Sequence, residues 1–119
     1  MPTDWQLING YLIGPTADLE DSNLADSNLI GANLTDADLT GARLDGAEMR
    51  GANLTRADLT GTNLAAAQMT NTTTLTNVRS GGIIYYVEPP GTGRDYFPPT
   101  LPTDWQLIDG YLIGPTADL

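Results

Sequence analysis

The sequence predicts an all-β protein in which the chain coils into a short β-helix behind an N-terminal β-hairpin. Three observations favour this fold class: a five-residue repeat fills residues 17–70, a nineteen-residue segment occurs twice, and all eight aromatic residues lie outside the repeat. Repetition at a short fixed period is typical of solenoid and β-helix proteins.

Within residues 17–70 a small residue recurs eleven times at five-residue intervals, from Ala17 to Ala67, and a Leu or Met follows it two positions later. A period of five fits neither a straight strand nor an α-helix. Residues two apart in extended backbone point to the same side, so each small residue and its Leu or Met face one interior. The polar and glycine-rich pair that follows must turn the chain, and a chain that turns the same way every five residues coils.

Three of these triplets, Ala32-Asn33-Leu34, Ala37-Asp38-Leu39 and Ala57-Asp58-Leu59, resemble the A(D/N)LXX pattern of the pentapeptide-repeat protein family. The resemblance covers about half of the chain. It implies a right-handed, quadrilateral parallel β-helix with twenty residues per coil, here about three coils. In such a coil Met49 and Met69, the two repeat centres that are not Leu, would stack in one column.

A four-sided coil would also stack the outward-pointing residues every twenty positions. Asp18, Asp38 and Asp58 would then form one column with a spacing of about 4.8 Å, the distance between neighbouring strands. On another column Asp36 would lie below Arg56, which predicts an ion pair between coils that contributes little at an exposed site.

After Met69 the repeat slips, because the next large apolar residue, Leu75, comes six positions later instead of five. With Thr73 and Leu75 as an inward pair, we expect the coil to continue for one more side. Residues 78–82, which include two adjacent glycines, are then expected to end it.

The nineteen residues 1–19 return at 101–119 with two differences, one of which is Asn9 against Asp109. In the first copy apolar segments flank Asn9 and Gly10, a pair that favours a two-residue type I′ turn because both positions need positive φ. The segment therefore predicts a β-hairpin at each end of the chain. We expect the second hairpin to fold back over the last coil.

The sequence thus divides into four parts. They are a β-hairpin cap at 1–16, the pentapeptide-repeat β-helix at 17–80, a strand with a Pro/Gly/aromatic linker at 81–100, and the repeated hairpin at 101–119. Residues 83–87 are expected to be the strand, and residues 88–102, with five prolines, an extended linker or loop. The last part is interpreted as the opening of a truncated next module, the alternative being a protein that ends in a duplicated cap.

Composition argues against catalysis. The chain has no His, Cys or Lys, so the imidazole acid–base group, the thiol nucleophile and the Schiff-base amine are missing. Carboxylate pairs such as Asp36 and Asp38 exist, but both are expected to point outward from a solvated wall, where burial does not tune a pKa. We therefore expect no enzyme activity, no cofactor and no metal, since carboxylates arranged in a straight line cannot surround an ion. A net charge of −10 argues against direct binding to nucleic acid, which needs clustered basic residues.

The N-terminus lacks a basic region followed by an apolar segment, and no stretch approaches 18 apolar residues. The sequence therefore predicts neither a signal peptide nor a membrane span, and it indicates no compartment. The expected partner is an unidentified protein, with no membrane binding. The chain is expected to be a monomer or to self-associate weakly through the end at which the second hairpin lacks a following coil.

Two groups of residues are candidate interaction surfaces: the acidic column of Asp18, Asp38 and Asp58, and the aromatic pair Tyr96 and Phe97, which lies between prolines. The alternative for the acidic column is a solvated face on which Asp is used because its short polar side chain suits a turn. The alternative for the aromatic pair is packing against the end of the β-helix. Residues 91–94 are expected to be a turn, because they lack the Lys and the following helix of a phosphate-binding loop.

The leading hypothesis is a non-enzymatic structural or protein-interaction module of a tandem pentapeptide-repeat protein. The alternative comes from the resemblance: some members of the family mimic DNA and inhibit topoisomerases such as gyrase. The repeat carries nine acidic residues and three Arg. The net negative charge of the repeat is therefore about 0.5 per Å of coil axis, against about 0.6 per Å for duplex DNA. The short length opposes mimicry, because about 13 Å of coil corresponds to only about four base pairs.

Overall fold

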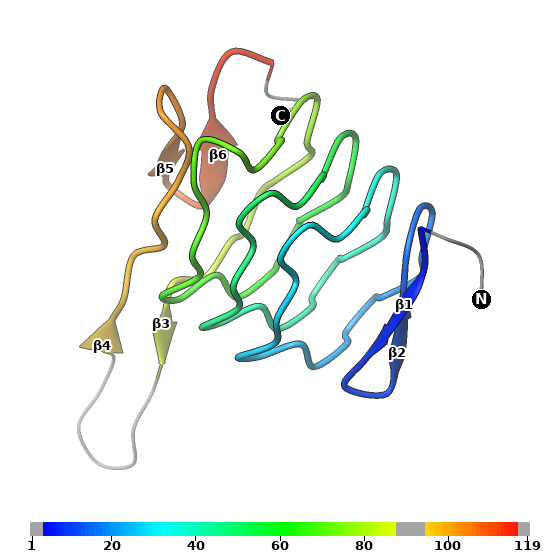
Figure 1. Cartoon of the computed structure of the whole chain (residues 1–119). Helices are drawn as coiled ribbons and strands as arrows, with labels where there is room; N and C mark the ends of the chain where they lie inside the picture. Colours follow the sequence, from blue (N-terminus) through cyan, green and yellow to red (C-terminus); the bar gives the residue numbers. More distant parts are fainter. Residues whose placement is uncertain (1–3, 88–94, 117–119) are drawn as a thin grey trace.

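The computed structural model describes residues 4–87 and 95–116, and these residues form an all-β protein (Figure 1). A coiled chain occupies the middle, and two-stranded antiparallel sheets flank it. No helix in the described ranges is long and apolar enough to cross a membrane. The sheets pair β1 (Gln6–Ile8) with β2 (Tyr11–Ile13), β3 (Tyr86–Val87) with β4 (Asp95–Tyr96), and β5 (Gln106–Ile108) with β6 (Tyr111–Ile113).

Isolated parallel bridges join each turn of the coiled chain to the next. Bridged positions recur every five residues, and in the first turns each residue pairs with the one twenty positions later, the spacing of the columns expected from the sequence. Backbone hydrogen bonds support each bridge: the amide of Asp38 donates to Ala17 (2.9 Å) and that of Leu19 to Asp38 (2.8 Å). The four ladders are Asp18-Asp38-Asp58-Arg79, Asn23-Arg43-Asn63-Ile84, Asn28-Glu48-Gln68-Thr100 and Asn33-Asn53-Thr74.

The interior of the coil is filled by the repeat itself. All eleven Leu and Met centres from Leu19 to Met69 are at most 2% exposed, and the small residues two positions before them are buried as well. A small and a large side chain alternate along each inner wall, so a narrow coil is filled without aromatic rings. Full burial of each centre contributes about 1.5–3 kcal/mol.

The corners explain the Gly, Asp and Asn content of the repeat. One residue of each corner between residues 16 and 66 has left-handed backbone, as in the column of Asp21 (φ 57°), Gly41 (φ 70°) and Gly61 (φ 71°). Asp and Asn tolerate this conformation better than other residues with a Cβ. At Gly41 a Cβ would also collide with the carboxylate of Asp21, so a side chain there would have to displace that carboxylate.

The six-residue spacing after Met69 forms a longer corner. The amide of Thr73 donates to the carbonyl of Thr70 (2.9 Å), and the hydroxyl of Thr73 donates to the carbonyl of Met49 one turn below (2.6 Å). Thr73 and Leu75 are both buried, which confirms the predicted inward pair. The next three bridges, from Asn53 with Thr74 to Asn63 with Ile84, therefore join residues 21 apart.

The expected end of the coil at residues 78–82 was wrong. Arg79 bridges Asp58, and Ile84 bridges Asn63, so the coil continues along two more sides. The two glycines do not break the pattern, because they make another left-handed corner: the amide of Gly61 donates to the carbonyl of Gly81 (2.8 Å).

Residues 83–87 are correspondingly not one strand. Ile83 is buried in the interior and Ile84 belongs to a ladder, and only Tyr86–Val87 forms β3. A run of β-branched and aromatic residues suits a coil wall as well as a strand, since both are extended. Sequence alone therefore did not separate the two.

The segment expected to be a linker also returns to the coil. Residues 88–94, which include the expected turn at 91–94, lie outside the described residues. After β4 the carbonyl of Phe97 accepts a hydrogen bond from the amide of Ala66 (2.7 Å), and Thr100 bridges Gln68. The chain thus leaves the coil after Tyr85 and returns to it at Thr100, which joins the next ladder, that of Asn28, Glu48 and Gln68.

Each hairpin lies at one end of the coiled chain, and the two ends are opposite (Figure 1). The second hairpin folds back on the last turn, as expected: Leu112 is buried, its amide donates to the hydroxyl of Ser80 (2.9 Å), and the amide of Asn77 donates to the hydroxyl of Thr116 (3.0 Å). The last turn is thereby covered by residues that follow it in the chain.

The two hairpins have the same internal structure. Asn9 and Gly10 have φ of 51° and 83°, and Asp109 and Gly110 have φ of 49° and 83°, which confirms the turn predicted from positive φ at both positions. The exchange of Asn for Asp leaves the turn unchanged because both side chains tolerate left-handed backbone.

Candidate interaction surfaces

The acidic column exists as expected, because parallel bridges join Asp18 to Asp38 and Asp38 to Asp58. Each carboxylate turns back on its own chain instead of standing free. In each case Oδ1 accepts a hydrogen bond from the amide two residues later: Glu20 at 3.3 Å, Thr40 at 3.0 Å and Thr60 at 3.0 Å. The column is therefore also a row of turn-forming residues.

Asparagine side chains accept the same hydrogen bond on the other three ladders. The Oδ1 atoms of Asn23, Asn28, Asn33, Asn53 and Asn63 accept from the amides of Ala25, Ile30, Thr35, Thr55 and Ala65 at 2.9–3.2 Å. Asp and Asn can both make this contact, which explains why the repeat accepts either one at its central position. On the acidic ladder, hydrogen bonds from Thr40, first from its side chain and then from its backbone, hold the pKa of Asp38 below its usual value.

One carboxylate outside the predicted column joins it. Oxygen atoms of Asp18, Glu20 and Asp38 lie within 4.8 Å of one another at the surface. Sequence reasoning omitted Glu20, although its place two residues after Asp18, at the amide that Asp18 binds, was a usable signal. All three residues are exposed, one oxygen of Asp38 already accepts a hydrogen bond from the amide of Thr40, and the group forms an acidic surface.

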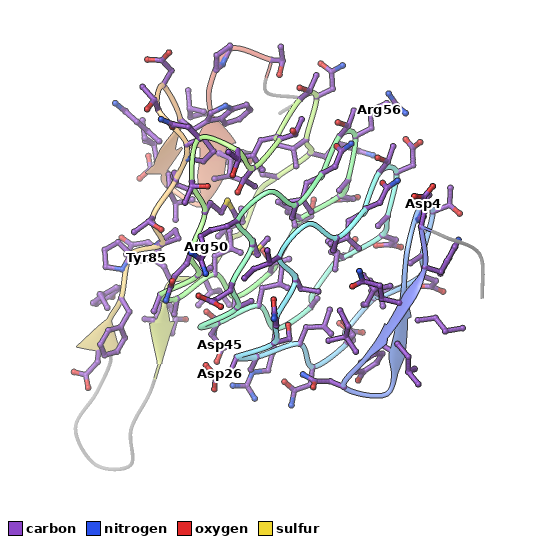
Figure 2. The ribbon with its side chains drawn as sticks, viewed as in Figure 1. Asp4, Asp26, Asp45, Arg50, Arg56 and Tyr85 are labelled. Atoms are coloured by element: carbon purple, nitrogen blue, oxygen red, sulfur yellow. The ribbon has the colours of Figure 1, made fainter. Side chains whose placement is uncertain are left out.

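The predicted ion pair between coils is present. The guanidinium of Arg56 donates from Nε to Oδ1 of Asp36 (2.7 Å) and from Nη2 to Oδ2 (2.9 Å), and these hydrogen bonds lower the pKa of Asp36. Figure 2 shows Arg56 at one edge of the coil and Asp26 with Asp45 at the opposite edge. Two further pairs, Arg43 with Asp45 (2.8 Å) and Arg50 with Glu48 (3.2 Å), join residues two apart.

The aromatic pair lies on the excursion from the coil. Tyr96 in β4 faces Tyr86 in β3, and its ring centroid lies 5.5 Å from that of Tyr85 and 5.6 Å from that of Tyr86. Tyr96 and Phe97 nevertheless stay exposed. The three tyrosines thus form one small aromatic cluster at the base of the β3–β4 sheet.

Phe97 extends this surface to a corner of the coil. It lines a cavity of about 240 Å³ together with Asp26, Asp45 and Ala66. Phe97 lies above the corner that contains Ala66, whose amide donates to the carbonyl of Phe97. The acidic residues lie on another ladder, that of Asp18, Asp38 and Asp58. The structure therefore places the two predicted candidate surfaces apart, and they do not form a joint site.

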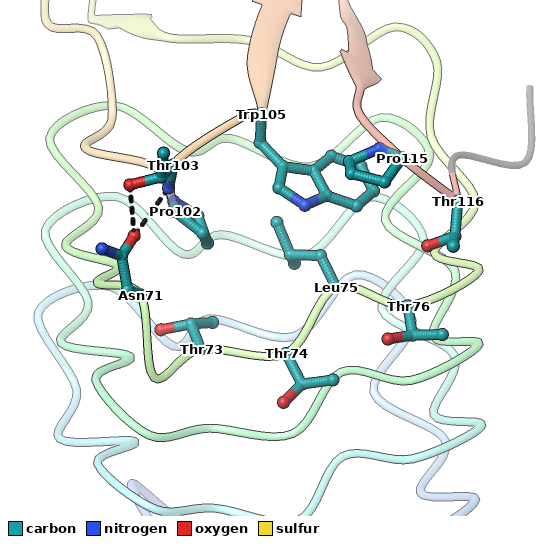
Figure 3. A pocket seen from close by; sticks show the side chains of 10 residues that line it. All are labelled: Asn71, Thr73, Thr74, Leu75, Thr76, Pro102, Thr103, Trp105, Pro115 and Thr116. Atoms are coloured by element: carbon teal, nitrogen blue, oxygen red, sulfur yellow. Dashed lines mark hydrogen bonds between the residues drawn. The ribbon is translucent and has the colours of Figure 1, made fainter.

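A larger cavity, about 390 Å³, lies where the second hairpin meets the last turn of the coil (Figure 3). Leu75 points toward the ring of Trp105, and Thr103 is held at the rim by Asn71, whose Oδ1 accepts from its amide (2.6 Å) and from its hydroxyl (2.8 Å). The remaining lining comes from Thr73, Thr74, Thr76, Pro102, Pro115 and Thr116.

None of these ten lining residues is an acid or a base, so the cavity offers hydroxyl groups and apolar surface, not proton transfer. Sequence reasoning missed this cavity. The frame slip at residues 70–75 was the available signal, because an extra residue at a corner necessarily disturbs the end of an otherwise regular coil.

Comparison with known families identifies the repeat. A family model described as pentapeptide repeats (8 copies) matches residues 17–56 and 37–73. This part of the chain belongs to the pentapeptide-repeat family, whose members are generally structural or interaction modules. The match ends before residues 74–85, which continue the coil without the repeat sequence.

Solved structures similar to this chain are also pentapeptide-repeat proteins. One from the cyanobacterium Cyanothece is 27% identical with a TM-score of 0.46, over 59% of this chain and 50% of that one. One from the Arabidopsis thaliana thylakoid lumen is 33% identical with a TM-score of 0.32, over 56% and 52%. HetL of Nostoc, involved in heterocyst differentiation regulation, is 29% identical with a TM-score of 0.24, over 60% and 39%.

The matched region thus spans about half, or less, of the length of these structures. The search of curated proteins found no match.

Proposed function

We propose that the chain is a non-enzymatic structural and protein-interaction module of a tandem pentapeptide-repeat protein. The observation that carries this proposal is the use of the outward polar side chains. Eight central Asp and Asn residues accept hydrogen bonds from the amides of their own turns. Their acceptor atoms stabilise corners, and the walls form a uniform polar surface around a filled interior.

The architecture that fits this role is a four-sided coil with a hairpin cap at each end. Bridged positions five residues apart, with partners twenty residues away, support four sides. The packing of Ile13 against the first turn and of Leu112 against the last supports caps, because open apolar ends of a solenoid need cover.

Mimicry of DNA is the alternative, and the charge pattern favours it less. Each of the three arginines in the repeat pairs with a carboxylate, and these pairs interrupt the acidic surface at three different positions around the coil of residues 37–56. Pairing of this kind leaves the walls less uniformly negative than a phosphate backbone. A DNA supercoiling assay with gyrase separates the two functions: the module should leave the rate unchanged, and inhibition would favour mimicry.

The structural role is tested by changing the length of the coil. Duplicating residues 37–56 adds one full period in register, and the longer chain should melt cooperatively at or above the temperature of the parent. The matched control duplicates residues 39–56, which adds two residues too few and moves the inward side chains out of their columns. An equal melting temperature for both insertions would contradict a register-defined structural module.

A further inference from the structure

The repeated hairpin has two apolar faces. Because Leu7 pairs with Leu12 and Ile8 pairs with Tyr11, these pairs lie on opposite sides of the two-stranded sheet. Ile13, paired with Gln6, lies on the side of Ile8 and Tyr11. We call these the leucine face and the isoleucine face.

In the first hairpin the isoleucine face is seated on the coil. Ile13 is 1% exposed, and Ile8 and Tyr11 pack against the core. The leucine face points away, with Leu7 63% and Leu12 56% exposed. The coil that contacts this hairpin comes after it in the chain.

In the second hairpin the faces exchange roles. Leu112 is 0% exposed and Leu107 packs against the core, whereas Ile108 is 47% and Tyr111 41% exposed. The coil that contacts this hairpin comes before it in the chain. The same strand sequences, QLI and YLI, therefore bind a coil through either face.

We propose that the hairpin is a two-sided coupler that binds the end coils of two pentapeptide arrays at once. Its leucine face binds the array before it and its isoleucine face binds the array after it. This inference rests on the proposed role in a tandem protein and adds the partner. The exposed isoleucine face of residues 106–113 takes the first coil of another pentapeptide array.

The first hairpin shows how the isoleucine face binds the first coil of an array. On its isoleucine face Ile13 enters the core beside the first turn, and the hydroxyl of Tyr11 accepts a hydrogen bond from the amide of Asn23 (3.1 Å). Tyr111 and Ile113 repeat both side chains in the second hairpin, where one edge of the exposed Tyr111 ring borders Gly81 of the preceding coil. The sequence after it, Ala117-Asp118-Leu119, is that of Ala17-Asp18-Leu19, the first pentapeptide of the array.

The test places a second array after the second hairpin. Residues 20–119 are appended directly after Leu119, which places a second array behind the second hairpin with the same 100-residue interval. Ile113→Asp should lower the melting temperature slightly in the parent chain and several-fold more in the extended chain, in which Ile113 becomes an interior residue. Leu12→Asp is the matched control, because its face stays free in both chains and its small loss should not change.

A second, milder substitution keeps the test valid if Ile113→Asp unfolds the protein completely. Ile108→Thr keeps the preference for extended backbone, and it should be near neutral in the parent and measurably destabilising in the extended chain. Equal losses in the two chains for both substitutions would overturn the coupler. Such a failure is distinct from a failure of the proposed function, because the coil-duplication and gyrase experiments leave this face unchanged.

Discussion

The two hairpins have the same strand sequences and the same internal structure, yet they bury opposite faces. Both have the same strand pairing, the same turn and a Trp ring stacked over the glycine after the second strand. Only the neighbouring coil differs: it follows the first hairpin and precedes the second. Local sequence therefore decides the shape of the hairpin, and the position of the coil decides which residues are core.

The largest effect should come from a charge on the leucine face. Leu112→Asp places an unpaired carboxylate in the core beneath the second hairpin and should cost several kcal/mol. Leu12→Asp, the same change in the first hairpin, should cost at most about 0.5 kcal/mol because its side chain is mainly in solvent. Urea unfolding of both variants measures the difference, and equal losses would contradict the assignment of faces.

The isoleucine face should show the opposite order. Ile13→Ala removes a fully buried side chain next to the first turn and should cost about 2–5 kcal/mol. Ile113→Ala removes a partly exposed one and should cost less than half as much. Together with the leucine pair, these two variants form a crossed set. A general difference in stability between the two ends cannot reproduce that pattern.

A third pair should show no difference between the hairpins. A Cβ on Gly14 would collide with the ring of Trp5, and a Cβ on Gly114 would collide with the ring of Trp105 in the same way. Each Gly→Ala substitution should therefore force a similar displacement of the ring and cost about 1–3 kcal/mol. Near-ultraviolet circular dichroism of each variant reports the displaced tryptophan. A loss at one end only would mean that the two hairpins do not share this packing.

The repeat and the hairpins were predictable because each depends on short-range rules. Alternation of Ala and Leu fixed the interior, and Asn9 with Gly10 fixed a turn. The last turn was not predictable in the same way. Thr100 bridges Gln68, 32 residues earlier, and no local pattern shows that a chain which leaves the coil after Tyr85 will return to it.

The candidate surfaces also divide into those that the repeat predicts and those that depend on contacts between residues distant in sequence. The acidic column came directly from the twenty-residue period, and so did the pair of Asp36 with Arg56. The cavity beside Trp105 did not, because it depends on where the second hairpin lands on the last turn. Contacts between elements that are distant in sequence were the part that periodicity could not supply.

The smallest expected effect concerns the residue that differs within the turns. Asn9→Asp makes the first turn identical to the second, and both residues have nearly the same φ, 51° and 49°. Since Asn and Asp both tolerate left-handed backbone, the free energy of unfolding at pH 7 should change by less than about 0.5 kcal/mol. The reverse exchange, Asp109→Asn, is the control and should be equally mild. The second turn has a contact with its coil, because the amide of Ile83 donates to the carbonyl of Gly110 (3.1 Å). A larger change at that end only would show that this contact makes the second turn sensitive to the exchange.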